Sequence, residues 1–377
     1  MLASIIARAA LVLPFIAALS ILPAGSAAQD ADAPDSGIAN KGVVELETGR
    51  ASDISVNMAQ DIASIIDDGA TRRVVPVVGK GAVQTLADLR FLRGIDLAIV
   101  QSDVLDYAKE QHLLPGLQSS LTYVAKLYNE EFHLLARPDI KTVADLANQT
   151  VDIGVQGSGS AVTATRLFGL LKIKVTTATD NEAVALDRLR KGEIAAIGFV
   201  AAKPVPFIQL LKPADGLHLL SIPLTSPVIA AYAPTRLTAS DYPSIVAAER
   251  PIDTIAVGSV LMAADLRFMP DRYRSTANAV EAFFTGFQTL LTPGHEAKWQ
   301  EVNIASELPG WTRFPPAQEW LRQNIQAATL LNPGNLKTLF SEFIDERRQA
   351  TGRAPMSPDE KDALFHQFQA WQRGQAR

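Results

Sequence analysis

Two short loops carry the residue types best suited to binding chemistry in this 377-residue chain. The first is Thr48-Gly49-Arg50-Ala51-Ser52 and the second is Gln156-Gly157-Ser158-Gly159-Ser160. Each lies between a strand-like run and a helix-like run. Free backbone N–H groups and the positive end of a helix dipole favour an anion at such a point. Glycines let a ligand approach the backbone, and hydroxyl groups add hydrogen-bond donors. The pattern predicts an anion site shared by two loops, whereas either loop alone would equally be an ordinary helix cap.

Further polar residues are expected at the same edge of the fold. Gln101 and Ser102 end a third strand-like run, and Asp103 is either part of that edge or the cap of the next helix. Arg50, Lys80 and Lys203 are candidate cations for a ligand carboxylate, which an arginine can bind through two parallel hydrogen bonds. The alternative for each cation is a solvated surface charge.

Signatures of catalysis and of cofactor binding are missing from the sequence. Gly157-Ser158-Gly159 lacks the G-x-S-x-G spacing of a nucleophile elbow, and Gly79-Lys80-Gly81 is not a P-loop. The five histidines have no metal-ligand spacing, and the chain contains no cysteine. Glu130 and Glu131 are adjacent in an extended segment, so they point to opposite faces as one surface charge and one buried or capping group. We predict no catalytic residue, no metal and no cofactor.

Composition limits the class of protein. The chain is 47% hydrophobic and 20% charged, which is typical of globular proteins, and its length suggests two domains. The net charge of −5 disfavours a nucleic-acid binder, which would need clustered lysine and arginine.

The N-terminal residues predict export. Arg8 precedes the apolar run Ala9–Leu22, and small residues at Ser26-Ala27-Ala28 suggest cleavage after Ala28. The alternative is a membrane anchor, but the run is short for the roughly 20 residues that span a bilayer. We therefore expect a cleaved signal peptide at 1–28, a flexible leader at 29–41 and a mature protein in the bacterial periplasm.

Strands and helices alternate between Gly42 and Ser226, which favours parallel α/β sheets. Beyond about residue 275 the pattern becomes mostly helical. The expected strands are Val43–Glu47, Arg73–Val78, Asp96–Val100, Phe132–Ala136, Val151–Val155, Lys174–Thr177, Ala195–Val200, Leu217–Ile222 and Val228–Ala233. The expected helices are Ser52–Asp67, Val83–Leu92, Asp103–Glu110, Ala161–Leu171, Glu182–Lys191, Pro204–Leu211, Thr276–Leu291, Pro316–Leu330, Leu336–Gln349 and a last one opened by the capping box Ser357–Glu360.

A series of motifs resembles one family of periplasmic proteins. They are Thr48-Gly49, Asp96–Asp103 (DLAIVQSD), Tyr128 with Glu130, His133 and Leu134, Ile140–Leu146 followed by Val151–Gly154, Gly157–Ser160, and Pro204 with Pro206 and Ile208. In this order they resemble the TAXI branch of the extracytoplasmic solute receptors of TRAP (tripartite ATP-independent periplasmic) transporters. The first loop departs from the branch, because its glycines and aromatic residues are mostly replaced and Arg50 is present. Lys203 occupies the position of a tyrosine.

The resemblance implies an α/β, two-lobed type II periplasmic binding protein fold with a helical C-terminal extension. The first lobe would comprise 42–128 and 229–294, the second 129–228, and the extension 295–377 would pack on the first lobe. The chain would cross between lobes at Tyr128–Phe132 and at Ser226–Ala231. The ligand-binding residues would be Thr48, Gly49, Arg50, Ala51, Ser52, Gln101, Ser102, Tyr128, Gly157, Ser158, Gly159, Ser160 and Lys203.

The implied function is capture of a small organic anion, either a carboxylate or an amino acid, and its delivery to TRAP-type membrane permease subunits. The alternative is a periplasmic ligand-sensing subunit that signals to a membrane partner. An exported hydrolase is disfavoured because no nucleophile and base can be paired. Ligand identity, coupling ion and oligomeric state stay open.

Overall fold

The computed structural model describes residues 42–324 except Ser52, together with positions 340, 341, 344, 348, 356, 357 and 360–365. The expected signal peptide, the leader and most of the helices expected after residue 324 lie outside the described residues. No helix among the described residues has the length and apolar character needed to cross a membrane.

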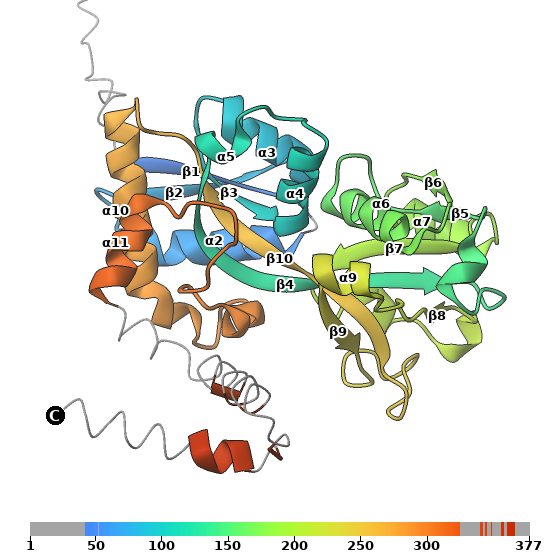
Figure 1. The fold of residues 1–377 in the computed structure, drawn as a ribbon. Coiled ribbons are helices and arrows are strands. Elements are labelled where there is room, and N and C mark those ends of the chain that lie inside the picture. Colours follow the sequence, from blue (N-terminus) through green and yellow to red (C-terminus); the bar gives the residue numbers. More distant parts are fainter. Residues whose placement is uncertain are drawn as a thin grey trace, which may run out of the picture. The chain divides into compact units, whose positions relative to one another are not determined.

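One mixed sheet runs through the described region in the order β2-β1-β3-β10-β4-β7-β5-β6 (Figure 1). Strand β1 is parallel to both β2 and β3, and β5 is parallel to both β6 and β7. The two ends of the sheet therefore have the same arrangement of parallel strands, β2-β1-β3 at one end and β6-β5-β7 at the other, with the earliest strand of each three in the middle. The strands are β1 (Val43–Thr48), β2 (Arg73–Val78), β3 (Ile95–Gln101), β4 (Thr122–Ala136), β5 (Thr150–Asp152), β6 (Thr176–Ala178), β7 (Ala196–Ala201), β8 (His218–Leu219), β9 (Ala233–Leu237) and β10 (Ile252–Ala263).

Helices follow the parallel strands, as the alternating pattern predicts. The α-helices are α2 (Ile54–Ile66), α3 (Ala82–Phe91), α4 (Ser102–Glu110), α5 (Leu117–Ser120), α6 (Gly159–Leu171), α7 (Glu182–Arg190), α8 (Pro206–Gln209), α9 (Ser226–Ala231), α10 (Pro270–Leu290) and α11 (Pro315–Gln323). The 3₁₀ helices are η1 (Val143–Leu146), η2 (Pro213–Asp215) and η3 (Ala297–Glu301).

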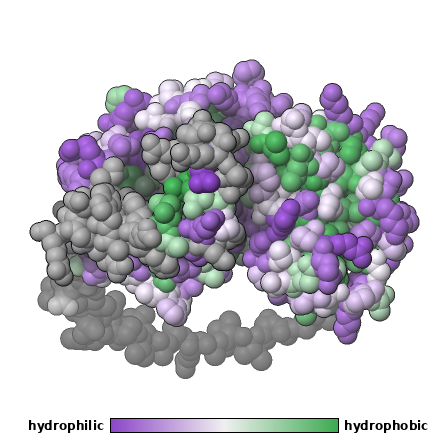
Figure 2. All heavy atoms as spheres, turned by 60° about the horizontal axis from the view of Figure 1, so that its bottom comes forward, coloured by the Kyte–Doolittle hydropathy of each residue, from purple (hydrophilic) through white to green (hydrophobic). Residues whose placement is uncertain are grey.

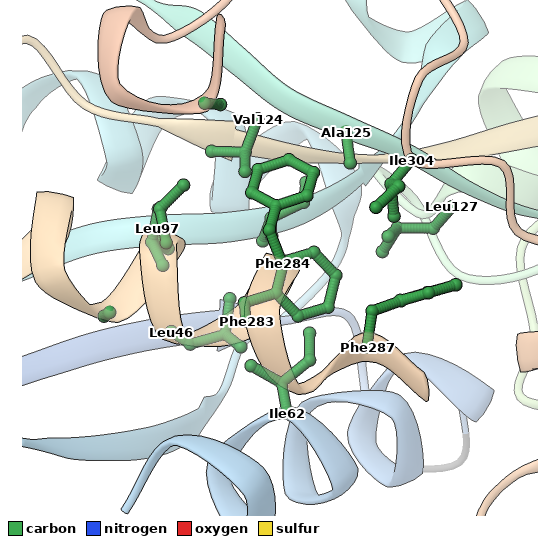
Figure 3. Packing of buried hydrophobic residues seen from close by; sticks show 14 of the residues in the cluster. Leu46, Ile62, Leu97, Val124, Ala125, Leu127, Phe283, Phe284, Phe287 and Ile304 are labelled. Carbon is green, nitrogen blue, oxygen red and sulfur yellow. The ribbon is translucent and has the colours of Figure 1, made fainter. Parts of the chain in front are cut away.

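Two pairs of hydrophobic clusters define two lobes. The first lobe is built by the clusters around β1, β3, α2, α3, α4 and α10, and the second by the clusters around β5, β7, α6 and the loop after α8. The first lobe has a three-phenylalanine centre: Phe283, Phe284 and Phe287 of α10 lie in one cluster with Ile62 of α2 and Leu46 of β1 (Figure 3). The expected α/β two-lobed fold is confirmed.

Two long antiparallel strands connect the lobes. Along β4, Tyr128 packs in a first-lobe cluster and Phe132 in a second-lobe cluster, so the chain passes from one cluster to the other between these residues. The return crossing lies further along the chain than expected, because Val257 packs in the second lobe and Leu261, on the same strand β10, packs in the first.

The segment expected to form that return crossing is part of the second lobe. Residues 226–231 form α9, not the strand expected at Val228–Ala233, and a proline lies in the first turn of this helix. Tyr232, Leu237 and Tyr242 then pack in second-lobe clusters. Burial of these side chains keeps the chain in the second lobe until β10.

Residues of the C-terminal extension between Trp299 and Leu321 pack on the first lobe. Trp299 of η3 is fully buried and its ring centroid lies 6.1 Å from those of Phe283 and Phe287. Phe314 and Leu321 belong to the same cluster.

Candidate functional site

Residues from both lobes line one small cavity of about 40 Å³, which we call the inner cavity. It lies at the carboxyl ends of β1 and β3 and at the start of α6, where ligands bind in open α/β folds. Seven of the predicted residues line it: Gly49, Arg50, Gln101, Tyr128, Ser158, Gly159 and Ser160. An outer cleft of about 650 Å³ adjoins it and shares Arg50, Glu130 and Ser160 with it.

The other predicted residues lie around the inner cavity or away from it. Ala51 lines the outer cleft, Thr48 is fully buried beneath the first loop, and Ser52 lies outside the described residues. Ser102 and Gly157 flank residues that line the cavity without lining it themselves.

Lys203 does not point into either space. Its Nζ donates a hydrogen bond to the carbonyl oxygen of Arg236 and lies 3.4 Å from Asp241 Oδ2. Its backbone N–H donates to Glu131 Oε2 at 3.0 Å. The structure therefore gives this lysine a role within the second lobe, instead of the predicted contact with ligand.

The first loop is shaped by Asp53, which precedes α2. The Arg50 backbone N–H donates to Asp53 Oδ2 at 2.7 Å, and Arg50 Nη2 lies 3.6 Å from Asp53 Oδ1. The Gly49 N–H donates to Ser55 Oγ at 3.2 Å. Asp53 thus orients the arginine at the mouth of the cavity and balances part of its charge. A guanidinium has five N–H donors, so this pair leaves others for a ligand.

The second loop begins α6 and uses its hydroxyl groups as acceptors. Ser158 Oγ accepts a hydrogen bond from the Ala161 N–H at 3.2 Å, the usual cap geometry. Ser160 Oγ accepts one from the Val200 N–H at 3.0 Å. Because a hydroxyl also carries one donor, both serines can still donate to a ligand.

The second loop is in close contact with the first lobe at the start of α3 and at Gln101. The Val83 N–H of α3 donates to the Gly157 carbonyl oxygen at 3.1 Å. A Cβ added to Gly159 would lie 1.3 Å from Gln101 Oε1, so any larger residue there would require the Gln101 side chain to move. This is a closed arrangement, which leaves room for only a few water molecules in the inner cavity.

Glu130 is the residue of this site that sequence reasoning missed. It lines both the cavity and the cleft and is 6% exposed. Its Oε2 accepts hydrogen bonds from Gln101 Nε2 at 2.9 Å and from Ser259 Oγ at 3.3 Å. Burial raises its pKa to about 7, although these two donors lower it. Its Oε1 accepts no hydrogen bond among the described residues, so one carboxylate oxygen remains for a ligand.

Glu131 points to the opposite face, as the strand alternation predicts. It is also buried, with Lys298 Nζ 3.4 Å from its Oε1. The sequence could not show this, because the cation comes from η3, more than 160 residues later.

His133 is a structural residue. Its Nε2 lies 2.7 Å from the Tyr242 hydroxyl and its Nδ1 lies 2.9 Å from the Glu131 carbonyl oxygen. The Tyr242 oxygen accepts from the Val205 N–H, so its own proton goes to Nε2. Burial lowers the pKa of His133 to about 3, so the ring is neutral near pH 7.

The outer cleft has an acidic side and an apolar side. The apolar side includes Phe199, Phe207 and Leu210, the last 79% exposed. Figure 2 shows the surface hollowed between the two lobes, with apolar side chains on the second lobe beside the hollow. Carboxylates lining the cleft are Asp53, Glu130, Asp152, Asp180, Glu182 and Glu296. No group of three or more potential metal-binding side chains is found in the described part of the chain.

The chain belongs to the NMT1-like family, whose model matches residues 47–266. Its structure is similar to that of a TctC solute-binding protein from Polaromonas, at 14% identity, covering 66% of this chain and 88% of that one, with a TM-score of 0.38. It is also similar to the alkanesulfonate-binding protein SsuA from Xanthomonas axonopodis pv. citri, at 14% identity, with 79% and 92% covered and a TM-score of 0.42. It is similar as well to the periplasmic binding protein BugD, at 14% identity, covering 76% of this chain and 96% of that one, with a TM-score of 0.43.

Proposed function

We propose that this protein is a periplasmic solute-binding receptor that captures a small organic anion between its lobes. The observation that carries the proposal is the meeting of both loops, one from each lobe, at one cavity with Arg50 at its edge. Helices α2 and α6, each of 13 residues, begin at these loops and direct the positive ends of their dipoles towards it. A ligand that touches both loops would bind the closed form and shift the lobes towards closure. No catalytic step is assigned to this chain.

Within the anion class, Glu130 favours an amino acid over a simple carboxylate. A carboxylate ligand would contact Arg50 and the helix N-termini, while Glu130 Oε1, which accepts no hydrogen bond among the described residues, would accept from the ligand's ammonium group. A dicarboxylate would instead place a second carboxylate beside Glu130, and a 2-oxo acid would place a carbonyl oxygen there, which accepts hydrogen bonds but has none to donate. The pKa near 7 also allows a protonated Glu130 that donates to a carboxylate, and the experiment below separates the two cases.

The test is calorimetry of residues 29–377, stripped of ligand by unfolding and refolding, against amino acids and their matched 2-hydroxy acids. We expect an amino acid to bind at least about ten-fold more tightly than its hydroxy-acid partner, because one charge-assisted hydrogen bond is lost. Arg50→Gln should weaken binding of both ligands at least about ten-fold. Arg93→Gln, at an exposed position, is the matched control and should bind like the wild type.

Glu130→Gln separates the two roles of Glu130. The glutamine carbonyl oxygen still accepts from Gln101 and Ser259, so the fold is kept. Binding of the amino acid should fall, because the negative charge is gone. If Glu130→Gln retained binding of the amino acid, a neutral, protonated Glu130 would be the form that binds the ligand, and the proposed preference for amino acids would be wrong. Failure of every organic anion to bind, or an unchanged affinity in Arg50→Gln, would refute the receptor proposal.

We further propose delivery of the solute to a TRAP-type membrane permease. The order of the sequence motifs supports it, and a signalling role towards a membrane kinase is the competing function. Proteoliposomes that contain the permease encoded beside this gene should take up labelled ligand only when the loaded receptor is added. A lone histidine kinase gene in that place, whose autophosphorylation responds to the loaded receptor, would support sensing instead.

A further inference from the structure

A second contact between the lobes lies outside both the inner cavity and the outer cleft. It joins α4 of the first lobe to α6 and Tyr232 of the second (Figure 1). Thr163 Oγ1 donates to Asp103 Oδ2 at 2.7 Å, and the Tyr232 hydroxyl donates to the same oxygen at 3.1 Å. Asp103 is 2% exposed, so the second lobe supplies the partners of a carboxylate that the closed arrangement removes from water.

Arg166 of α6 bridges the same two helices. Its Nη1 donates to the Asp103 carbonyl oxygen at 3.2 Å, and its Nη2 donates to Glu110 Oε1 at 2.7 Å. Asp106 Oδ2 lies 4.0 Å from the guanidinium. These three acceptors belong to α4, in the first lobe. The guanidinium carbon also lies 5.8 Å from the centroid of the Tyr232 ring, which is within cation–π range.

The contact also buries apolar surface. Val162, which precedes Thr163 on α6, is 5% exposed and belongs to the same cluster as Val104 and Leu105 of α4 in the first lobe. Parting the lobes would expose this valine and return Asp103 to water. Apolar side chains and one carboxylate oxygen of Asp103 are therefore paired across this interface, whereas its other oxygen, Oδ1, is buried without a hydrogen-bond partner among the described residues.

We propose that Asp103, Thr163, Arg166 and Tyr232 form an interlobe latch, which holds the lobes closed without help from the ligand. The latch would set the fraction of ligand-free protein that is closed. If the proposed function holds and ligand binds the closed form, its apparent dissociation constant is the intrinsic value divided by that fraction. Residues that never touch the ligand would thereby tune its affinity.

The latch can be tested without any ligand. The chain has no cysteine, so spin labels can be attached at Arg93→Cys on the first lobe and Lys174→Cys on the second, both exposed. The distance distribution between the labels gives the closed-to-open ratio. Thr163→Val with Tyr232→Phe removes both donors to Asp103 but keeps side-chain shape, and we expect this ratio to fall at least about ten-fold.

Tyr242→Phe is the matched control, because it removes the same kind of hydroxyl from the second lobe. The partners of that hydroxyl are His133 and Val205, both in the second lobe. This variant should melt at a lower temperature than the wild type and leave the distance distribution unchanged. Arg166→Gln, at a partly exposed position, gives a second route to opening if the double variant fails to fold.

Three results would overturn the latch. The first is a ligand-free wild type with no closed component. The second is a double variant, shown to be folded by circular dichroism, with the wild-type distribution. The third is equal opening in Tyr242→Phe, which would indicate general loosening. None of these results depends on which solute is bound, so the latch and the proposed function can fail separately.

Discussion

Gly159→Ala should weaken ligand binding although it leaves each lobe intact. The added methyl carbon would lie 1.3 Å from Gln101 Oε1, on the other lobe. Gln101 is the neighbour that can move, and moving it breaks the 2.9 Å hydrogen bond from its Nε2 to Glu130 Oε2. A hydrogen bond to a charged group contributes about 1.5–3 kcal/mol, and 1.4 kcal/mol is a factor of ten. The closed form should therefore become about 10- to 100-fold less populated relative to the open form.

The assay combines the label distances with calorimetric affinity for whichever solute the proposed calorimetric screen identifies. Gly169→Ala, on the same helix α6, is the matched control, because an added Cβ there meets nothing within 4 Å. It should bind like the wild type and melt at a higher temperature, since alanine favours a helix over glycine by up to about 1 kcal/mol. If Gly159→Ala bound as tightly as Gly169→Ala, the closed contact between Gln101 and Gly159 would have no part in binding.

Three further predictions concern pH and the packing around the hinge. Burial in the closed form raises the pKa of Asp103 to about 6, so closure is coupled to the uptake of a proton. The closed fraction, measured from the label distances, should therefore rise as the pH falls from 7 to 5. In Asp103→Asn the part of this rise that is due to Asp103 should be absent. Trp299→Ala should lower the free energy of unfolding by about 3–5 kcal/mol in urea, because it empties a fully buried site; a loss under 1 kcal/mol would refute this packing. Lys298→Met should lower the free energy of unfolding by about 3 kcal/mol, because it leaves the buried Glu131 without Lys298 as its ion-pair partner. Adding Glu131→Gln should recover most of this loss of stability. If stability did not recover, the lost ion pair would not be its cause.

The loops that line the inner cavity could be predicted because they depend on local sequence patterns. Each loop follows a strand and begins a helix, and the carboxyl ends of neighbouring parallel strands meet at one edge of a sheet. Gly49 and Gln101, which follow the neighbouring strands β1 and β3, could therefore be placed together from sequence, whereas placing Ser158 beside them required the expected two-lobed architecture, because β5 belongs to the other lobe. The fold class follows from the same alternation of strands and helices.

The central strand β10 could not be predicted in this way. It pairs with the nearby strand β9, but its neighbours in the centre of the sheet are β3 and β4, which lie more than 100 residues earlier in the chain, so that pairing has no local signature. Residues 226–231 show the opposite failure. Their β-branched residues suggested a strand, but Ser226-Pro227 is a helix start, and the helix forms.

The chemistry of the cavity depends on tertiary neighbours. Alternation along β4 predicted that Glu130 and Glu131 face opposite ways. That both are buried follows from Ser259 of β10 on one side and Lys298 of η3 on the other. Lys203 shows the same dependence, since Asp241 and the Arg236 carbonyl oxygen hold its side chain away from the cavity.

Native mass spectrometry of residues 29–377, purified without denaturation, tests solute capture most directly. We predict an adduct with the mass of a small amino acid or carboxylic acid in the wild type, reduced in Arg50→Gln and kept in Arg93→Gln. After unfolding and refolding, the adduct should be absent and should return when that solute is added. A wild type that carries no adduct and binds no amino acid or carboxylate when a panel is added would contradict the account.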